Sequence, residues 1–417
     1  MTKTNQKIPE GWSVKKLGEC FSFLKTSSYS RAETTDFGDV HYIHYGDIHT
    51  KYPLHIFPKD INIYISTEQA SKSDYLKTGD LILLDASEDY EGTTKCVELL
   101  NISNDEKIVS GLHTLALRDT AQNFIDGFRA YITSTPFVRN NFWKQVTGIK
   151  VYGVSKDNLK NIKLLLPPLP EQEKIAEILG CWDSAIEKLS KLIEQKKLLK
   201  KGLMQRLLSG KQRLSGFSDP WENVKLRELF SKSLLKNKDA KILPILTNSA
   251  TLGIVLQDDY FDREIVTKEN VCNYYCVENG DFIYNPRISK NAPAGPIKRN
   301  HFQGKGCISP LYTVFKINSE NYASFYEIYF ESNLWVYEAY KVANYGARSD
   351  RMNITDEDFF NIKLPHPPLS EQKAIADILS KADEEITLLT SKLSALKSQK
   401  KGLMQKLLTG QIRVKAA

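Results

Sequence analysis

The sequence has no apolar run long enough to cross a membrane or to direct secretion. Its longest apolar runs, such as residues 162–169, are short and interrupted by proline, whereas a membrane-spanning helix needs about 20 consecutive apolar residues. Residues 1–12 contain none of the apolar core that marks a signal peptide. These absences predict a cytoplasmic chain with no membrane partner.

Cysteine is also scarce. The six cysteines are scattered through 417 residues without a CxxC pair. Cys272 and Cys276 lie four residues apart, but no second pair accompanies them to complete a zinc site. We therefore expect free thiols in a reducing cytoplasm.

The motifs that bind phosphates, dinucleotides or methyl donors are missing. The sequence has no GxxxxGK[ST] loop, no GxGxxG turn, and no Asn/Asp-Pro-Pro-aromatic motif of amino-methyltransferases. Asn285-Pro286-Arg287 matches only the first part of the last motif, and we interpret it as a turn. The chain is therefore predicted to carry no catalytic residues and to bind no cofactor.

Two clusters of possible metal ligands remain, one of histidines and one of carboxylates. Neither has a spacing known to converge on one ion, so we interpret the histidines as ordinary core or surface residues and the acidic run as a solvated loop. The predicted metal content is none. The residues concerned are His41, His44, His49 and His55, and Asp85, Glu88, Asp89 and Glu91.

The chain does contain enough apolar residues to build cores, and a small excess of positive charge. Hydrophobic residues make up 41% and aromatic residues 10%, which excludes wholesale disorder. Of the net charge of +7, residues 171–213 contribute ten basic and six acidic residues, and residues 371–417 contribute nine and five. The remaining residues are therefore close to neutral, so any contact with DNA must come from local patches.

An internal repeat organises the chain. Residues 161–180, NIKLLLPPLPEQEKIAEILG, match residues 361–380, NIKLPHPPLSEQKAIADILS, at 13 of 20 positions with an offset of 200. Residues 200–210 match residues 400–410 at nine of eleven positions with the same offset. Two blocks in one register indicate a duplication.

The duplication extends more weakly into the region before each block. Trp12 corresponds to Trp221, and a Gly-Asp turn leads into a β-rich run at residues 77–84 and again at 278–284. An aromatic-rich helical stretch follows in each copy, at residues 124–145 and 324–341, and then a basic loop that contains glycine. We therefore predict two similar lobes of mixed α/β (α+β) structure, each followed by a long helix. The predicted boundaries are 1–165 and 214–365 for the lobes, and 166–213 and 366–417 for the helices.

Each repeat ends in a single long helix. The motif Pro-Pro-Leu-x-Glu-Gln suits a helix start, because proline fits the first turn and acidic residues favour the positive end of the helix dipole. Gly210 is a suitable stop. Residues 171–209 would form about 58 Å of helix at 1.5 Å per residue.

Apolar residues in both helices recur at alternating spacings of four and three, which is the stripe of a coiled coil. Only Lys196, Lys200 and Lys400 interrupt the two stripes. Because each stripe needs a partner, we predict that the helices form an antiparallel pair with a lobe at each end. The apolar seam residues are Ile175, Leu179, Trp182, Ile186, Leu189, Ile193, Leu203, Leu207, Ile375, Leu379, Ala382, Ile386, Leu389, Leu393, Leu396, Leu403 and Leu407.

The last part of each helical segment is basic. Seven basic residues and no acidic residue follow Gln195 as far as Arg213, and the same holds after Ile386 as far as Lys415. These charges either complement the helix dipole on a solvated face or approach DNA phosphates or an acidic partner. Both interpretations fit the sequence.

Taken together, these motifs resemble one family. The Trp and Lys-Leu at the start of each lobe, the Gly-Asp strand, and Pro-Pro-Leu-x-Glu-Gln leading into Lys-Lys-Gly-Leu-Met-Gln look like the specificity subunit of type I restriction-modification systems. The resemblance covers nearly the whole chain. The helix motif, which occurs twice, is its most specific part.

The resemblance implies that each lobe is a target-recognition domain for one half of a bipartite DNA site. It also implies that the helix pair sets the spacer and docks two copies of a methylation subunit, which a restriction subunit can join. S-adenosylmethionine, ATP and Mg²⁺ would be bound by those partner subunits. Because the lobes differ in sequence, the half-sites should differ. Four residues inserted near Leu189 should lengthen the spacer.

Candidate DNA contacts lie mainly in the basic loops before the Pro-Pro segments, where glycines let the backbone approach phosphate. Arginine is the expected base reader and lysine the expected phosphate contact. The candidates are Lys150 and Tyr152 in the first lobe, Arg348 and Arg351 in the second and, as second choices in a proline-containing loop, Arg287 and Lys290.

Two rival interpretations come from other functional classes. The chain could be a self-contained nuclease or methyltransferase whose site follows no known motif, or a coiled-coil scaffold with two protein-binding lobes. Incubating the purified chain alone with DNA, S-adenosylmethionine and Mg²⁺ tests the first. Gel shifts of the assembled complex with and without the chain test the second.

Overall fold

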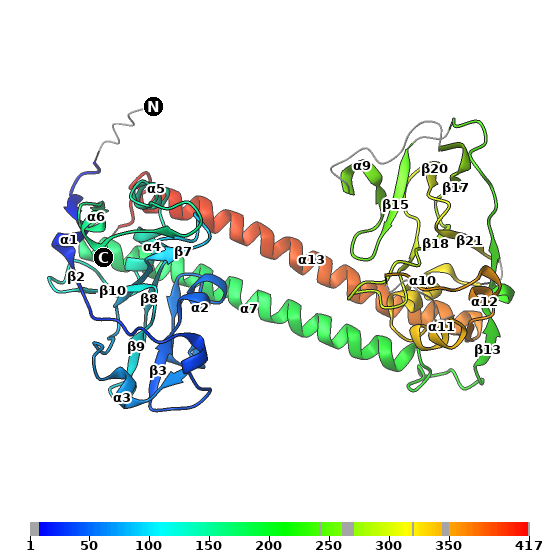
Figure 1. Cartoon of the computed structure of the whole chain (residues 1–417), viewed down its shortest axis with the longest axis horizontal. Helices are drawn as coiled ribbons and strands as arrows, with labels where there is room; N and C mark the ends of the chain where they lie inside the picture. The colour runs from blue at the N-terminus through cyan, green and yellow to red at the C-terminus, as the bar shows by residue number, and fades with distance from the viewer. Residues whose placement is uncertain (1–7, 242–243, 261–270, 319–320, 344–349, 416–417) are drawn as a thin grey trace. The chain divides into compact units, whose positions relative to one another are not determined.

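The computed structural model describes residues 8–241, 244–260, 271–318, 321–343 and 350–415. It divides into two compact units, coloured along the chain in Figure 1. Unit 1 comprises residues 1–190 and 391–417, and unit 2 comprises residues 191–390. Each unit therefore holds half of each long helix and one lobe. Lobe 1 is the part of unit 1 that precedes helix α7 (Leu169–Leu207), and lobe 2 is the part of unit 2 between α7 and α13 (Leu369–Leu407).

Lobe 1 mixes short helices and strands, as the sequence predicts. Its elements are β1 (Ser13–Lys16), α1 (Leu17–Cys20), β2 (Phe21–Phe23), η1 (Arg31–Glu33), β3 (Val40–Ile43), α2 (Tyr45–Thr50), β4 (His55–Ile56), η2 (Pro58–Asp60), β5 (Tyr64–Ile65), α3 (Thr67–Ala70), β6 (Leu81–Leu84), β7 (Ala86–Ser87), β8 (Cys96–Leu99), β9 (Ile108–Ser110), β10 (Thr114–Asp119), α4 (Arg129–Thr133), α5 (Pro136–Trp143), β11 (Tyr152–Gly153), α6 (Lys156–Lys160) and β12 (Lys163–Leu166).

The strands of lobe 1 form a five-stranded sheet, order β2-β10-β6-β8-β4, and a three-stranded sheet, order β5-β3-β9. Strands β1 and β12 pair antiparallel, with Ser13 opposite Leu166, and so join the two ends of the lobe. Gly79, at φ +85°, makes the predicted turn before β6, and Asp80 accepts the backbone N–H of Lys77 across it.

Lobe 2 contains the corresponding elements. They are β13 (Glu222–Lys225), α8 (Leu226–Leu229), β14 (Phe230–Lys232), β15 (Ile245–Ser249), β16 (Gly253–Leu256), α9 (Gln257–Tyr260), η3 (Val271–Asn273), β17 (Tyr275–Val277), β18 (Phe282–Tyr284), β19 (Ile297–Arg299), β20 (Gly306–Ile308), β21 (Thr313–Ile317), α10 (Ala323–Glu331), α11 (Val336–Val342), α12 (Asp356–Phe360) and β22 (Lys363–His366).

Lobe 2 repeats the plan of lobe 1 with modifications. Its main sheet has the order β14-β21-β18-β19, and a second sheet has the order β16-β15-β20-β17. Strand β13 pairs with β22 as β1 pairs with β12. Asp281 accepts the N–H of Glu278 in the turn before β18, as Asp80 does in lobe 1. The duplication seen in the sequence is therefore a duplication of the fold.

The aromatic-rich stretches are helical, as expected, and each consists of two short helices. In lobe 1, Pro136 begins α5, and Thr135 caps it by accepting the N–H of Val138. The chain breaks there because proline cannot continue α4. In lobe 2 the break follows α10, where Ser332 is extended (φ −78°, ψ 162°).

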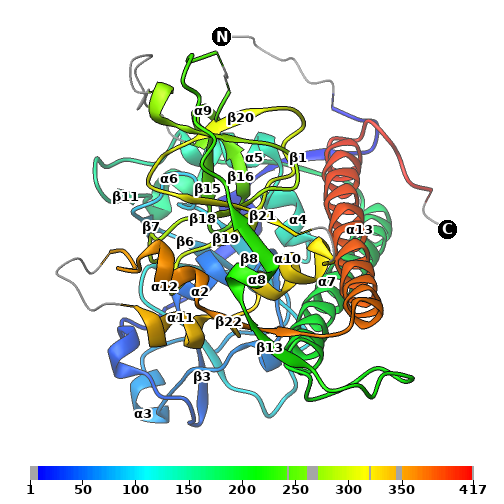
Figure 2. The ribbon, with the colours of Figure 1, turned by 90° about the vertical axis from the view of Figure 1, so that its right-hand side faces the viewer.

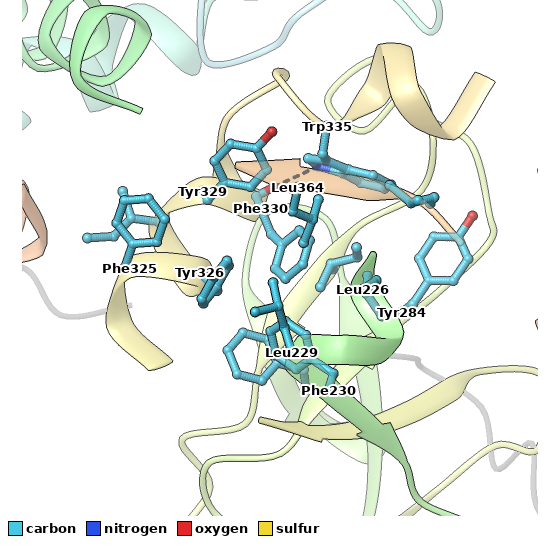
Figure 3. Packing of buried hydrophobic residues seen from close by; sticks show 14 of the residues in the cluster. Leu226, Leu229, Phe230, Tyr284, Phe325, Tyr326, Tyr329, Phe330, Trp335 and Leu364 are labelled. Atoms are coloured by element: carbon cyan, nitrogen blue, oxygen red, sulfur yellow. Dashed lines mark hydrogen bonds between the residues drawn. The ribbon is translucent and has the colours of Figure 1, made fainter. Parts of the chain in front are cut away.

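The core of lobe 2 is rich in aromatic rings, which Figure 3 shows around α10, α8 and β14. Phe230 lies edge-on to Phe282 and Phe315, with ring centroids 5.2 Å apart in both pairs. Trp335 donates its indole N–H to the carbonyl of Phe330 across the break between α10 and α11. Each such aromatic pair adds about 0.5–1.5 kcal/mol beyond its burial.

The two long helices are α7 (Leu169–Leu207) and α13 (Leu369–Leu407), and both are uninterrupted. Each starts two residues before the expected glutamate. Each is followed by a glycine with left-handed φ, Gly210 at +68° and Gly410 at +69°, which fits the expected stop. Figure 2 shows α7 and α13 side by side in the view turned by 90°.

Within each unit the helices pair antiparallel. In unit 1 the first half of α7 lies against the last half of α13, as the contact between Asp183 and Lys400 shows. In unit 2 the last half of α7 lies against the first half of α13, where Lys200 contacts Asp383. The predicted antiparallel helix pair is confirmed within each unit.

Each lobe core is closed by the helix end of the other repeat. Leu407, the last residue of α13, and the following Leu408 are buried in the core of lobe 1 beside Ile175 and Leu179. The residues at the same positions of the first repeat, Leu207 and Leu208, are buried in the core of lobe 2. The boundaries between the compact units therefore fall after residues 190 and 390, within the long helices. The sequence instead places the domain boundaries where each repeat ends.

Two negative findings concern the described residues alone. None of their helices is long and apolar enough to cross a membrane. They also contain no group of three or more histidine, cysteine and acidic residues placed to hold a metal ion. Of the clustered histidines, His41, His44 and His55 have ring nitrogens bonded to main-chain groups.

Candidate nucleic-acid interface

In lobe 1 the candidate loop is a short hairpin of residues 147–153. Thr147 and Gly153 exchange two backbone hydrogen bonds with N–O distances of 2.9 and 2.8 Å. Strand β11, which includes Gly153, also pairs with β7. Lys150 is exposed at the tip, and the half-buried ring of Tyr152 lies edge-on to Tyr90 at 5.2 Å. Lys150 is thus presented to solvent, while Tyr152 anchors the hairpin.

In lobe 2 the structure brings candidates from two distant loops together. Arg287 and Arg351 oppose each other in an antiparallel bridge, which main-chain hydrogen bonds of 2.9 and 2.8 Å flank on either side. Arg287 is exposed and Arg351 is half-buried. Lys290 is exposed farther along the loop of Arg287. Arg348 lies outside the described residues.

A cavity of about 360 Å³ lies beside the two arginines. Buried Asn248 of β15 lines it and donates its amide to the carbonyls of Ile283 and Pro296, at 2.8 and 3.2 Å. Asn285 donates to the main-chain oxygen of Asn248, and Tyr312 also lines the cavity. A hollow of this size, with amides inside and guanidinium groups among its lining residues, suits a polar anionic ligand.

Sequence reasoning found the arginines of this site but missed the residues behind them. Asn285 was within reach, because it belongs to the Asn-Pro-Arg turn that contains Arg287. Asn248 and Tyr312 carried no signal, since neither belongs to a motif. Asn248 reaches the cavity on the paired strand β15, and Tyr312 reaches it from the turn before β21.

The two lobes place their candidate loops equivalently. In each lobe, a segment follows the strand that comes after the Gly-Asp turn. This segment accepts a main-chain hydrogen bond from the loop that precedes a short helix. Val154 donates its N–H to Asp85 in lobe 1, and Met352 donates to Pro286 in lobe 2. The following helices, α6 and α12, are capped by a serine and a threonine. The frame is shared, while the loops it presents differ in sequence.

A buried glutamate at the start of each long helix locks the lobe to the helix pair. Glu171 accepts the indole N–H of Trp12 at 2.9 Å and two bonds from Arg413, both at 2.8 Å. In unit 2, Glu371 accepts the indole N–H of Trp221 at 2.8 Å. It also receives two bonds from Arg213, at 2.7 and 2.6 Å. The same three-residue contact therefore occurs once in each unit.

The lysines that interrupt the apolar seam form ion pairs across the helix pair. Lys200 contacts Asp383 at 2.5 Å, and Lys400 contacts the equivalent Asp183. Lys196 contacts Glu385 at 2.7 Å. Some of the basic side chains near the helix ends therefore form ion pairs within the protein. Sequence reasoning treated them only as dipole complements or external contacts, because the partner acids lie 183 or more residues away.

The other seam positions are all buried or half-buried, whereas several apolar residues off the seam are not. Leu198 of α7 is 69% exposed and Leu388 of α13 is 70% exposed. Leu192 and Leu199 on α7 are also exposed. The helix pair therefore has an apolar surface beyond its own seam in unit 2.

Replacing Trp12 or Trp221 with phenylalanine tests the buried glutamate contact. Either change keeps an aromatic ring, smaller than the indole, but removes the N–H donor to a buried carboxylate, so each should lower the free energy of unfolding by about 1–3 kcal/mol. Denaturant unfolding of Trp12→Phe and Trp221→Phe measures this. Trp143→Phe is the matched control, because the Trp143 indole bonds only to an exposed main-chain oxygen. Equal effects of all three substitutions would contradict the contact.

Lobe 1 has a second link to the helix pair through α4. Tyr131 donates its hydroxyl to Asp183 at 2.6 Å, and burial together with Asp183 raises the pKa of Tyr131, so the phenol stays protonated. Glu98 holds α4 in place by accepting from the backbone of Ala130 and from Arg129. Burial raises the pKa of Glu98, which Arg129 opposes.

The family model described as "Type I restriction modification DNA specificity domain" matches the chain twice, over residues 9–197 and 218–398. Both matches cover one lobe and most of the helix that follows it. The duplication recognised from the sequence is therefore a duplication of this domain.

Individual relatives agree with the family match. The chain is 27% identical to the type I restriction enzyme MjaX specificity subunit of Methanocaldococcus jannaschii, over 98% of this chain and 95% of that protein. The type I restriction-modification S subunit from M. genitalium has the same fold, with a TM-score of 0.54, 15% identity and coverage of 97% and 98%. The HsdS subunit from Thermoanaerobacter tengcongensis gives 0.51 and 18%, with coverage of 99% and 100%.

Proposed function

Since the chain belongs to the family of type I restriction-modification DNA specificity domains, we propose that its lobes read the two halves of one bipartite DNA site. It is the specificity subunit, the DNA-recognition component, of such a system. Lobe 1 reads one half-site through the 147–153 hairpin. Lobe 2 reads the other through Arg287 and Arg351.

The observation that carries this proposal is that the two lobes share their fold and their contact with the helix pair but present loops of different sequence. Each lobe is fixed to the helix pair by the same Trp-Glu-Arg contact. The loops presented beside β7 and β18 have unrelated sequences, and in lobe 2 Arg351 of this loop opposes Arg287 of the segment after β18. Equivalent placement of different reading groups is what an asymmetric bipartite site requires.

The helix pair is the proposed docking surface for the methylation subunit. Leu192, Leu198, Leu199 and Leu388 leave apolar area exposed on the half of the pair that belongs to unit 2. Two copies are proposed because the duplicated frame supplies two similar ends. A restriction subunit can join the complex, as the resemblance implies.

Catalysis is proposed to reside in the partner subunits. They would bind S-adenosylmethionine, ATP and Mg²⁺, while this chain supplies recognition and geometry. A complex that modifies cellular DNA would work in the cytoplasm. The support for this division is the family itself, together with a sequence that lacks the phosphate and methyl-donor motifs.

Arg351→Ala should relax sequence preference in one half-site only. A guanidinium that reads a base edge contributes about 1–3 kcal/mol of discrimination against the wrong base, so methylation should spread to sites altered at one position of the lobe 2 half-site. Single-molecule methylome sequencing of cells that express the full system measures this. Arg227→Ala, an exposed arginine of lobe 2 in α8, is the control. Uniform weakening at all sequences would instead make Arg351 a phosphate contact.

A further inference from the structure

The tip of the 147–153 hairpin carries two aliphatic side chains in open solvent. Ile149 is 91% exposed and Val151 is 56% exposed, one on each side of exposed Lys150. A single exposed aliphatic residue is common on protein surfaces. Two of them at the end of one projecting loop form an apolar tip for which the fold provides no partner among the described residues.

The fold holds this tip in one conformation. Gly148 has a φ of +130°, and a Cβ atom there would lie 2.0 Å from the carbonyl oxygen of Val151, so only glycine fits. The paired backbone bonds between Thr147 and Gly153 close the base of the hairpin. Tyr90, which packs on the hairpin, is itself held by its hydroxyl bond to the carbonyl of Trp143 at 3.0 Å. A preordered loop loses little entropy on binding.

The charges around the tip argue against a clamp on the phosphate backbone. Lys150 is the one cation within the hairpin, while Glu88 and Asp89 are exposed in the segment that follows the partner strand β7. These carboxylates would repel phosphates at close range. An exposed apolar tip fits the interior of the major groove, which is wide enough for a two-stranded β-ribbon and exposes the thymine methyl group.

We propose that Ile149 reads a thymine in the half-site of lobe 1 by packing against its 5-methyl group. This inference rests on the proposed function, since it requires lobe 1 to enter a half-site. It assigns the hairpin an apolar contact with one base. Lys150 then supplies a sequence-independent contact to a neighbouring phosphate.

Deoxyuridine scanning of the half-site tests the inference, because uracil differs from thymine only by the missing methyl group. The probe is a duplex carrying the methylation site, bound by the assembled complex of this chain with its methylation subunit. Replacing one thymine of the lobe 1 half-site should weaken binding about fourfold, the effect of one buried methyl group. With Ile149→Ala, the thymine duplex should bind more weakly and the same uracil replacement should have no further effect.

Two variants and one comparison separate the outcomes. Lys150→Ala should weaken binding to all duplexes equally and keep the uracil effect. Phe37→Ala, which removes another exposed apolar side chain of lobe 1 (81% exposed), should leave the uracil effect unchanged. A half-site without thymine on either strand, or a uracil effect that persists in Ile149→Ala, overturns the inference while sequence-specific binding stands. Loss of all preference for one half-site in the wild-type complex would overturn the proposed function itself.

Discussion

Residues 1–215, produced without the second repeat, should form a homodimer that directs methylation to a palindrome of the lobe 1 half-site. In unit 1, lobe 1 and the start of α7 pack against the end of the second repeat. The first repeat can supply nearly the same residues, so two copies can exchange helix ends around a twofold axis. The equivalent pairs are Lys200 and Lys400, Leu203 and Leu403, Met204 and Met404, Leu207 and Leu407, Leu208 and Leu408, and Arg213 and Arg413, with Leu214 in place of Val414.

Light scattering of the half-chain measures the dimer, and methylome sequencing with the methylation subunit measures its target. The change from an asymmetric to a palindromic site is complete rather than graded, because no lobe 2 remains to read its half. Lys200→Glu in the half-chain is the control, since it would set two like charges together where Asp183 meets Lys400 in unit 1. A monomeric half-chain, or methylation that still follows the asymmetric site, would contradict the prediction.

The parts of this fold that follow from local rules could be predicted from the sequence. The Gly-Asp turns need a residue at positive φ, and Gly79 and Gly280 both provide it. The seam of α7 and α13 follows from spacing alone, and the duplication supplied the pairing partner. Pro136 could also have been recognised as a break in the aromatic-rich stretch, because proline removes a helical hydrogen bond.

The parts that depend on distant contacts could not be predicted. Arg287 and Arg351 were chosen from separate loops, and nothing in their sequence indicates that they oppose each other. The cavity beside them depends on Asn248, whose amide is fixed by main-chain groups of two other segments. In lobe 1 the sequence singled out the charged Lys150, whereas the structure draws attention to its aliphatic neighbour Ile149.

The register of the helix pair leads to the second large effect, a change of spacer length. Asp183 meets Lys400 in unit 1, and Lys200 meets Asp383 in unit 2, so α7 and α13 have one register throughout. Four residues added near Leu189, as the sequence suggested, would lengthen α7 but leave α13 too short to keep both ion pairs. Whole heptads inserted after both Ser190 and Thr390 keep the apolar seam and both ion pairs.

Three heptads in each helix should move the preferred spacer up by about nine base pairs, whereas one heptad should abolish most methylation. One heptad adds about 10 Å, or about three base pairs at 3.4 Å each. That is roughly a third of a DNA turn, so the second half-site would turn away from its lobe. Three heptads add about 31 Å, close to the 34–36 Å of a full turn, which returns the half-site to the same face. Methylome sequencing reads out both spacer and half-sites. Unchanged spacers in the three-heptad chain, or equal activity of the two chains, would show that the helix pair does not set the spacing.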